Sequence, residues 1–167
     1  DNTVMQFNEV SDHKAPWDAQ GFDSDYNCRN TTIQYNYSHD NDGGLVLICN
    51  SGTYHGAGNQ GSAVQYNVSI NDAIRPRATR SGIFSANIHI AGPCKNTLVQ
   101  RNLLHVNPKT EPFIDRSIIT SDSWDGYADS TVFRENVFFV PQESEIRLNR
   151  STRNTFDGNY YLGNIKG

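Results

Sequence analysis

Asn30-Thr-Thr-Ile-Gln-Tyr-Asn36 is one of six copies of a seven-residue phrase that recurs along the 167-residue chain. The other copies begin at Asn2, Gly61, Asn96, Ser130 and Arg153. Every copy ends in asparagine, and successive final asparagines lie 28, 31, 35, 34 and 23 residues apart. A repeat of this length is typical of a solenoid in which each copy belongs to one coil.

The columns of the phrase have the alternation that a strand with one buried face requires. The residue three places before the final asparagine is always apolar: Met5, Ile33, Val64, Val99, Phe133 and Phe156. The next residue is always polar: Gln6, Gln34, Gln65, Gln100, Arg134 and Asp157. We therefore predict that the apolar column points inward and stacks from coil to coil.

The invariant asparagine predicts a ladder at a turn. Asparagine tolerates the left-handed conformation that ends a strand, and its amide both donates and accepts hydrogen bonds. We expect bonding along the stack between Asn8, Asn36, Asn67, Asn102, Asn136 and Asn159. The sequence thus predicts an all-β parallel β-helix of about six coils, a single domain over residues 1–167 or part of a longer helix. The alternative is an antiparallel β-sandwich with coincidental asparagines.

Composition narrows the range of partners. A net charge of −4 and a pI near 5.7 argue against nucleic acid, and the chain has no apolar run of membrane-spanning length. We expect Cys28, Cys49 and Cys94 to be small buried side chains and not a disulfide framework. Because the first coil begins at residue 2, we also expect further chain segments or another chain to cover the N-terminal edge of the stack.

The run from Phe22 to Thr31 (FDSDYNCRNT), continued by the residues from Gln34 to Gly44, resembles bacterial right-handed parallel β-helix proteins of the pectate-lyase-like superfamily. Many members are glycoside hydrolases, polysaccharide lyases or uronate epimerases. The resemblance implies a right-handed β-helix and a partner that is a polysaccharide or oligosaccharide. It also implies a secreted, periplasmic or cell-surface location.

Acidic residues gather after the asparagine column in the first two coils. Asp12 and Asp40 each follow an asparagine by four residues, so they share a column on strands about 4.8 Å apart. Retaining glycosidases pair carboxylates at roughly 5 Å, and such neighbours push their pKa values apart. The catalytic candidates are Asp12, Asp25, His39, Asp40 and Asp42. The candidates for substrate contact beside them are Trp17, Asp23 and Arg29.

Two other interpretations of these acids stay open. Aspartate after a strand is an ordinary turn former. The oxygen spacing of Asp23-Ser-Asp25 and Asp40-Asn-Asp-Gly43 also suits calcium, although neither continues as an EF-hand loop. We expect no cofactor and no metal site, with calcium as the alternative.

A second group lies in and near Ile74-Arg-Pro-Arg-Ala-Thr-Arg80. Arginines there would bind uronate carboxylates, or they would belong to a solvated loop. The substrate-contact candidates from this group are His55, Arg75 and Arg77, and His89 is also nearby in sequence. The segment from Asp122 to Asp129, with Trp124, is either a sugar platform or a loop packed on the stack.

The leading hypothesis is a glycoside hydrolase that uses paired carboxylates, because acids outnumber cationic bases in the first group. A uronate polysaccharide lyase or epimerase is the alternative enzyme. A non-catalytic β-helix for glycan binding or adhesion is the third possibility.

Overall fold

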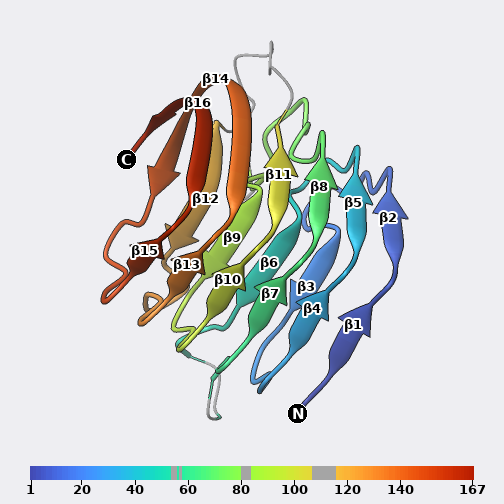
Figure 1. Ribbon diagram of the computed structural model, residues 1–167. Coiled ribbons are helices and arrows are strands. Elements are labelled where there is room, and N and C mark those ends of the chain that lie inside the picture. The colour runs from blue at the N-terminus through green and yellow to red at the C-terminus, as the bar shows by residue number, and fades with distance from the viewer. Residues whose placement is uncertain (54–55, 57, 80–83, 107–115) are drawn as a thin grey trace.

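The computed structural model of the protein describes residues 1–53, 56, 58–79, 84–106 and 116–167. Within these ranges the chain forms sixteen β-strands and no helix, so no helix there has the length or apolar character to cross a membrane. The strands follow one another in coils, and the two termini lie at opposite ends of the stack (Figure 1).

One strand from each copy of the phrase enters the first sheet. Its members pair in parallel in this order: β1 (Val4–Gln6), β4 (Thr32–Gln34), β7 (Ala63–Gln65), β10 (Leu98–Gln100), β13 (Val132–Arg134) and β15 (Thr155–Asp157). The register aligns like positions of the phrase, for example Ile33 with Val64 and Val64 with Val99. The repeat therefore maps one copy to one coil.

Two further series of strands make up the second sheet. The first series is β2 (Glu9–Ser11), β5 (Tyr37–His39), β8 (Val68–Ile70) and β11 (Leu103–His105). The other series is β3 (Phe22–Ser24), β6 (Val46–Cys49), β9 (Ile88–Ala91) and β12 (Ser117–Asp122). The long strand β14 (Val137–Arg147) pairs with β11 and with β12 and so joins the series, and β16 (Tyr160–Lys166) pairs with β14.

Every pair between the described strands is parallel. The predicted all-β chain with parallel strands is therefore confirmed, and these pairings exclude the antiparallel sandwich. The coils are consistent with a β-solenoid.

The predicted apolar column lies in the core. Ile33, Val64, Val99 and Phe133 are buried, whereas Met5 and Phe156 at the two ends of the column are more open. The ring of Phe133 stacks on that of Phe156 with centroids 4.7 Å apart. Burial of this column removes apolar surface from water in each coil and favours stacking of the next coil on it.

The asparagine ladder is confirmed. In each step the backbone N–H and the side-chain Nδ2 of one asparagine donate to Oδ1 of the asparagine on the following coil, at 2.9–3.1 Å, from Asn8 to Asn159. Nδ2 also bonds a carbonyl on the preceding coil, as Asn67 does with Ile33 O at 2.9 Å. The ladder therefore links three coils at each internal rung.

The prediction that these asparagines have the left-handed backbone conformation is wrong by one residue. The residue before each asparagine has the positive φ, between 51° and 60°: Phe7, Tyr35, Tyr66, Arg101, Glu135 and Gly158. Stacking of Phe7 on Tyr35 and of Tyr35 on Tyr66 accompanies this conformation. The asparagines are needed for their amides and not for their backbone freedom.

The outward glutamines and the three cysteines can also be compared with their predicted arrangement. The outward glutamines form a second ladder, with 2.8 Å bonds linking Gln6, Gln34, Gln65 and Gln100. All three cysteines are free, as predicted; Cys49 and Cys94 are buried and Cys28 is partly buried.

Asn67→Ala should destabilise the stack more than Gln65→Ala. The first change removes side-chain bonds to two neighbouring coils and leaves the backbone N–H of Asn36 and the carbonyl of Ile33 without these partners, which costs about 2–4 kcal/mol. The second removes partly exposed side-chain bonds and should cost less than about 1 kcal/mol. Chemical denaturation monitored by circular dichroism measures both. Equal losses would contradict the dominant role of the asparagine ladder.

Candidate functional site

The predicted acids lie in two separate places. Asp12, Asp40 and Asp42 follow strands β2 and β5, at a turn of the stack. Asp23 and Asp25 lie on and just after strand β3. The loop between these places carries Trp17, and this residue lines two hollows.

The turn group has the geometry of turn formers. Asp12, Asp40 and Asn71 have φ of 55°, 56° and 57° on successive coils, so the predicted shared column of Asp12 and Asp40 is present. Aspartate and asparagine adopt this conformation more easily than other side chains. Next to them, Asn41 donates to Asp72 Oδ1 at 2.8 Å, which forms a second short ladder.

The carboxylates of the turn group already have partners. Asp40 Oδ2 lies 2.8 Å from His39 Nδ1, and this hydrogen bond, with a second from Asn71, lowers the pKa of Asp40. Lys14 Nζ lies 3.8 Å from Asp12 Oδ1 and 3.6 Å from Asp42 Oδ1. A lowered pKa makes Asp40 a poor proton donor at neutral pH.

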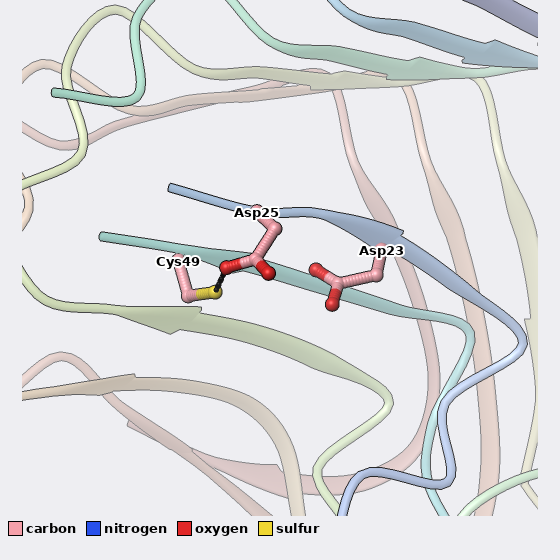
Figure 2. Close-up of side chains that lie close together, drawn as sticks. All are labelled: Asp23, Asp25 and Cys49. Carbon is pink, nitrogen blue, oxygen red and sulfur yellow. Dashed lines mark hydrogen bonds between the residues drawn. The ribbon is translucent and has the colours of Figure 1, made fainter. Parts of the chain in front are cut away.

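Asp23 and Asp25 project from the other series of strands. Along β3, Phe22 and Ser24 are buried, so the alternation of the strand turns the two aspartates to the outside. Pairing of β3 with β6 places Asp25 next to Cys49. Oxygen atoms of both carboxylates and Cys49 Sγ all lie within 4.8 Å of one another (Figure 2).

The two carboxyl groups have different surroundings. Although the Asp23 side chain is exposed, the protein atoms around it desolvate its carboxyl group and raise the pKa to about 7, and repulsion from Asp25 and Asp18 adds to this effect. Asp25 Oδ1 accepts a hydrogen bond from Tyr26 N at 2.7 Å and another from Cys49 Sγ at 3.2 Å. Burial raises the pKa of the Cys49 thiol, so it remains a protonated donor. Asp23 can therefore hold a proton near neutral pH, while the Asp25 carboxyl group accepts hydrogen bonds from Tyr26 and Cys49.

The same three residues are the donor group that could hold a metal ion among the described residues. Calcium requires six to eight oxygen ligands, and a thiol must lose its proton to bind a metal. Two carboxylates beside a protonated Cys49 do not meet these requirements. The calcium alternative thus has no support from this donor set.

A hollow of about 480 Å³ lies beside the acid pair, within the range of about 300–1,000 Å³ usual for ligand pockets. Its lining residues are Trp17, Asp18, Thr79, Phe84, Asp122, Ser123 and Trp124. Phe84 and Trp124 stack on each other, with centroids 5.9 Å apart, and pack against a cluster that includes Cys49. Cys49, which bonds Asp25, thus belongs to the cluster on which two rings of the hollow pack, and this places the hollow next to the acid pair.

His89 connects the hollow to the sheet. It lies on β9, and its Nε2 is 2.9 Å from Asp122 Oδ2. The hydrogen bond with His89 lowers the pKa of Asp122 despite partial burial of that carboxyl group. The sequence had suggested Trp124 as a sugar platform, but it did not indicate that Phe84 and Asp122 belong to the same site. Only the parallel register of β3, β6, β9 and β12 brings these residues together.

Arg75, a predicted contact for uronate, is bonded within the protein. Its side chain is buried, and it donates to Ala15 O at 2.8 Å and to Trp17 O at 2.5 Å. The guanidinium group thus holds the loop that carries Trp17. Arg77 is exposed and lines the second hollow, together with Lys14 and Asp42.

The two remaining candidates are Arg29 and His55. Arg29 pairs with Gln60 in the turn that precedes β4, and it lines neither hollow beside Trp17. His55 lies outside the described residues.

A further hollow, of about 600 Å³, lies at the last coil and is mostly apolar. Ile146, Leu148, Phe156, Tyr161 and Ile165 are among its lining residues. The described residues around it include no aspartate, glutamate or histidine, so no pair of carboxyl groups lies in that part of its wall.

Comparison with protein family models, with characterised proteins and with solved structures finds no match for this chain. The geometry around Asp23 and Asp25 therefore carries the functional argument alone.

The stability of the protein should depend on pH through Asp23. The folded state raises the pKa of Asp23 from 3.8 to about 7, so it favours the protonated form. The resulting stabilisation is fully present below pH 3.8 and is lost as the pH rises through about 7. Asp23→Asn cannot ionise and should raise the melting temperature relative to the wild type at pH 8, but not at pH 3.5.

Carbon-13 NMR of the Asp23 carboxyl group tests the cause directly. The midpoint of its titration should lie near 7 and should fall in the Asp25→Asn variant, because one repelling charge is removed. A midpoint near 4 in the wild type would contradict the raised pKa.

Arg75→Lys should loosen the loop that carries Trp17, because one ammonium group cannot replace both guanidinium hydrogen bonds. We expect cleavage by trypsin after Lys14 to become several-fold faster. Arg77→Lys is the matched control, because Arg77 is exposed, and it should leave this rate unchanged. Equal rates in both variants would show that Arg75 does not hold the loop.

Proposed function

We propose that this protein is a carbohydrate-active enzyme, a glycoside hydrolase that cleaves a polysaccharide or oligosaccharide with Asp23 and Asp25. We also propose that its solenoid is a right-handed parallel β-helix of the pectate-lyase-like type. The observation that carries the proposed activity is the unequal carboxyl pair, with the pKa of Asp23 at about 7, beside a hollow walled by aromatic rings.

In the proposed reaction, protonated Asp23 is the general acid. It gives its proton to the glycosidic oxygen as the bond from that oxygen to the anomeric carbon breaks. The carboxylate of Asp25 bonds to the anomeric carbon from the opposite face as that bond breaks. A water molecule completes hydrolysis: Asp23 takes its proton, its hydroxyl joins the anomeric carbon, and the bond to Asp25 breaks, so both side chains return to their starting forms. The short separation of the two carboxyl groups favours retention of configuration.

Aromatic side chains would supply the binding surface. The rings of Trp17, Phe84 and Trp124 line the hollow, and such faces pack well against the C–H faces of sugar rings. We also propose a secreted, periplasmic or cell-surface location for an enzyme with such a substrate.

Hydrolysis is better supported than elimination by a uronate lyase. A lyase needs a cationic group to neutralise the uronate carboxylate, but Arg75 is buried and bonded to Ala15 and Trp17, and Arg77 lines the second hollow and not the one beside the acid pair. Glycoside hydrolysis, by contrast, uses two carboxyl groups such as the acid pair supplies.

Release of reducing ends from a panel of neutral and acidic polysaccharides tests the proposed activity. Asp23→Asn and Asp25→Asn should each lower kcat by about 10²–10⁴-fold, while both variants remain folded. Activity of the wild type should decline as the pH rises above about 7, because Asp23 then loses its proton. NMR of the first product formed reports the configuration at the anomeric carbon.

Two variants test the competing location. If Asp40→Asn or Asp42→Asn abolishes turnover while Asp23→Asn retains it, the chemistry belongs to the turn group and the proposal fails. If the wild type binds glycans but releases no reducing ends, the protein is a glycan-binding β-helix.

A further inference from the structure

The charged side chains among the described residues that line the hollow beside the acid pair are all acidic. They are Asp18 and Asp122. The basic groups that act on them, Arg75 on Asp18 and His89 and Arg147 on Asp122, are not among the lining residues. Asp23 and Asp25 add acidic groups beside it, since Asp18 acts electrostatically on Asp23. An anionic ligand would therefore meet like charge in the described part of this wall.

Asp122 is the best-defined of these charges. The buried ring of His89 holds Asp122 Oδ2 at 2.9 Å, and Asn149 Nδ2 approaches Asp122 Oδ1 at 3.3 Å. The hydrogen bond from His89 lowers the pKa of Asp122, so the group is a carboxylate at neutral pH. Its side chain keeps 44% of its surface exposed and lines the hollow. It can therefore accept hydrogen bonds from a ligand without first losing its own partners.

The rest of the wall suits a sugar ring. Trp17, Phe84 and Trp124 present aromatic surface, and Thr79 and Ser123 have hydroxyl groups that can donate to a ligand or accept from it. Hydroxyl or ammonium groups of a sugar would donate to Asp122, whereas a uronate carboxylate there would be left without a donor and close to a negative charge.

We propose that this hollow is a sugar-binding subsite that selects rings without negative charge and rejects uronates, with Asp122 as the selecting residue. This inference rests on the proposed function, because it names the class of substrate for the same site. It directs the search toward neutral or amino-bearing glycans.

The chain has a built-in reporter for the test. It contains 2 tryptophans, and both Trp17 and Trp124 line the hollow, so intrinsic fluorescence reports directly on its occupation. The fluorescence titrations use the Asp23→Asn protein, so that the oligosaccharide probes are not cleaved during the measurement. The first pair of probes is a set of galacturonic acid oligosaccharides and the same oligosaccharides after reduction of their carboxyl groups. Cello-oligosaccharides and chitosan oligosaccharides of equal length provide neutral and cationic arms.

The uncharged or cationic probes should bind at least about tenfold more tightly than the acidic ones, a difference of about 1.4 kcal/mol. When Asp122→Asn is added to the Asp23→Asn protein, the galacturonic acid oligosaccharides should bind more tightly. The ratio of their dissociation constants to those of the reduced oligosaccharides should therefore fall. Adding Asp125→Asn is the control: Asp125 is exposed and does not line the hollow, but the substitution removes the same charge three residues away. The control should leave the ratio unchanged.

Three results would overturn the inference. These are equal or tighter binding of the acidic probes, the same change of ratio in the Asp122 and Asp125 variants, or no fluorescence response to any probe. The proposed hydrolysis is judged separately by the release of reducing ends from the wild type. Activity that depends on Asp23, together with indifference to the charge of the sugar, would reject the subsite and retain the hydrolase.

Discussion

The parallel register between coils is the constraint on which the rest of the structure depends. Backbone pairing places each residue beside its counterpart one coil away, about 4.8 Å distant. The asparagine ladder fixes that register at one turn, because each amide bonds the asparagine of the next coil and a carbonyl of the preceding one. A slip by one residue would break the ladder and also turn the apolar column outward. The positions of Asp25 beside Cys49 and of His89 above Leu47 follow from the same register.

The sequence predicted the core and the ladder because both recur at fixed places in the phrase. The apolar side chain before Gln or its equivalent is buried in every internal coil, and the asparagine amides bond as expected. The left-handed residue escaped prediction, since Tyr35, Arg101 and Glu135 have no intrinsic preference for that conformation. The two-residue turn imposes it on whichever side chain comes before the asparagine.

The site was less accessible to sequence reasoning. The column of Asp12 and Asp40 was found, because both follow the phrase at a constant distance, but it belongs to a turn with positive φ. The series from β3 to β12 has no repeated phrase, so nothing in the sequence aligned Asp25 with Cys49 or placed His89 near Asp122. Phe84 and Trp124 are 40 residues apart and meet only because their loops lie on neighbouring coils.

The connections between strands have a constant length at one turn of the coil and a variable length at the next. Between the first and second strands of every coil there are two residues, a spacing that the ladder requires. Between the second and third strands the gap ranges from six residues (40–45) to 17 residues (71–87), and it is in these gaps that Trp17 and Phe84 lie. The acid pair, by contrast, is at a strand, where its geometry is fixed by the coil register. Changes in the loops can therefore reshape the hollow that Trp17 and Phe84 line, while the backbone positions of Asp23 and Asp25 stay fixed by the strand register.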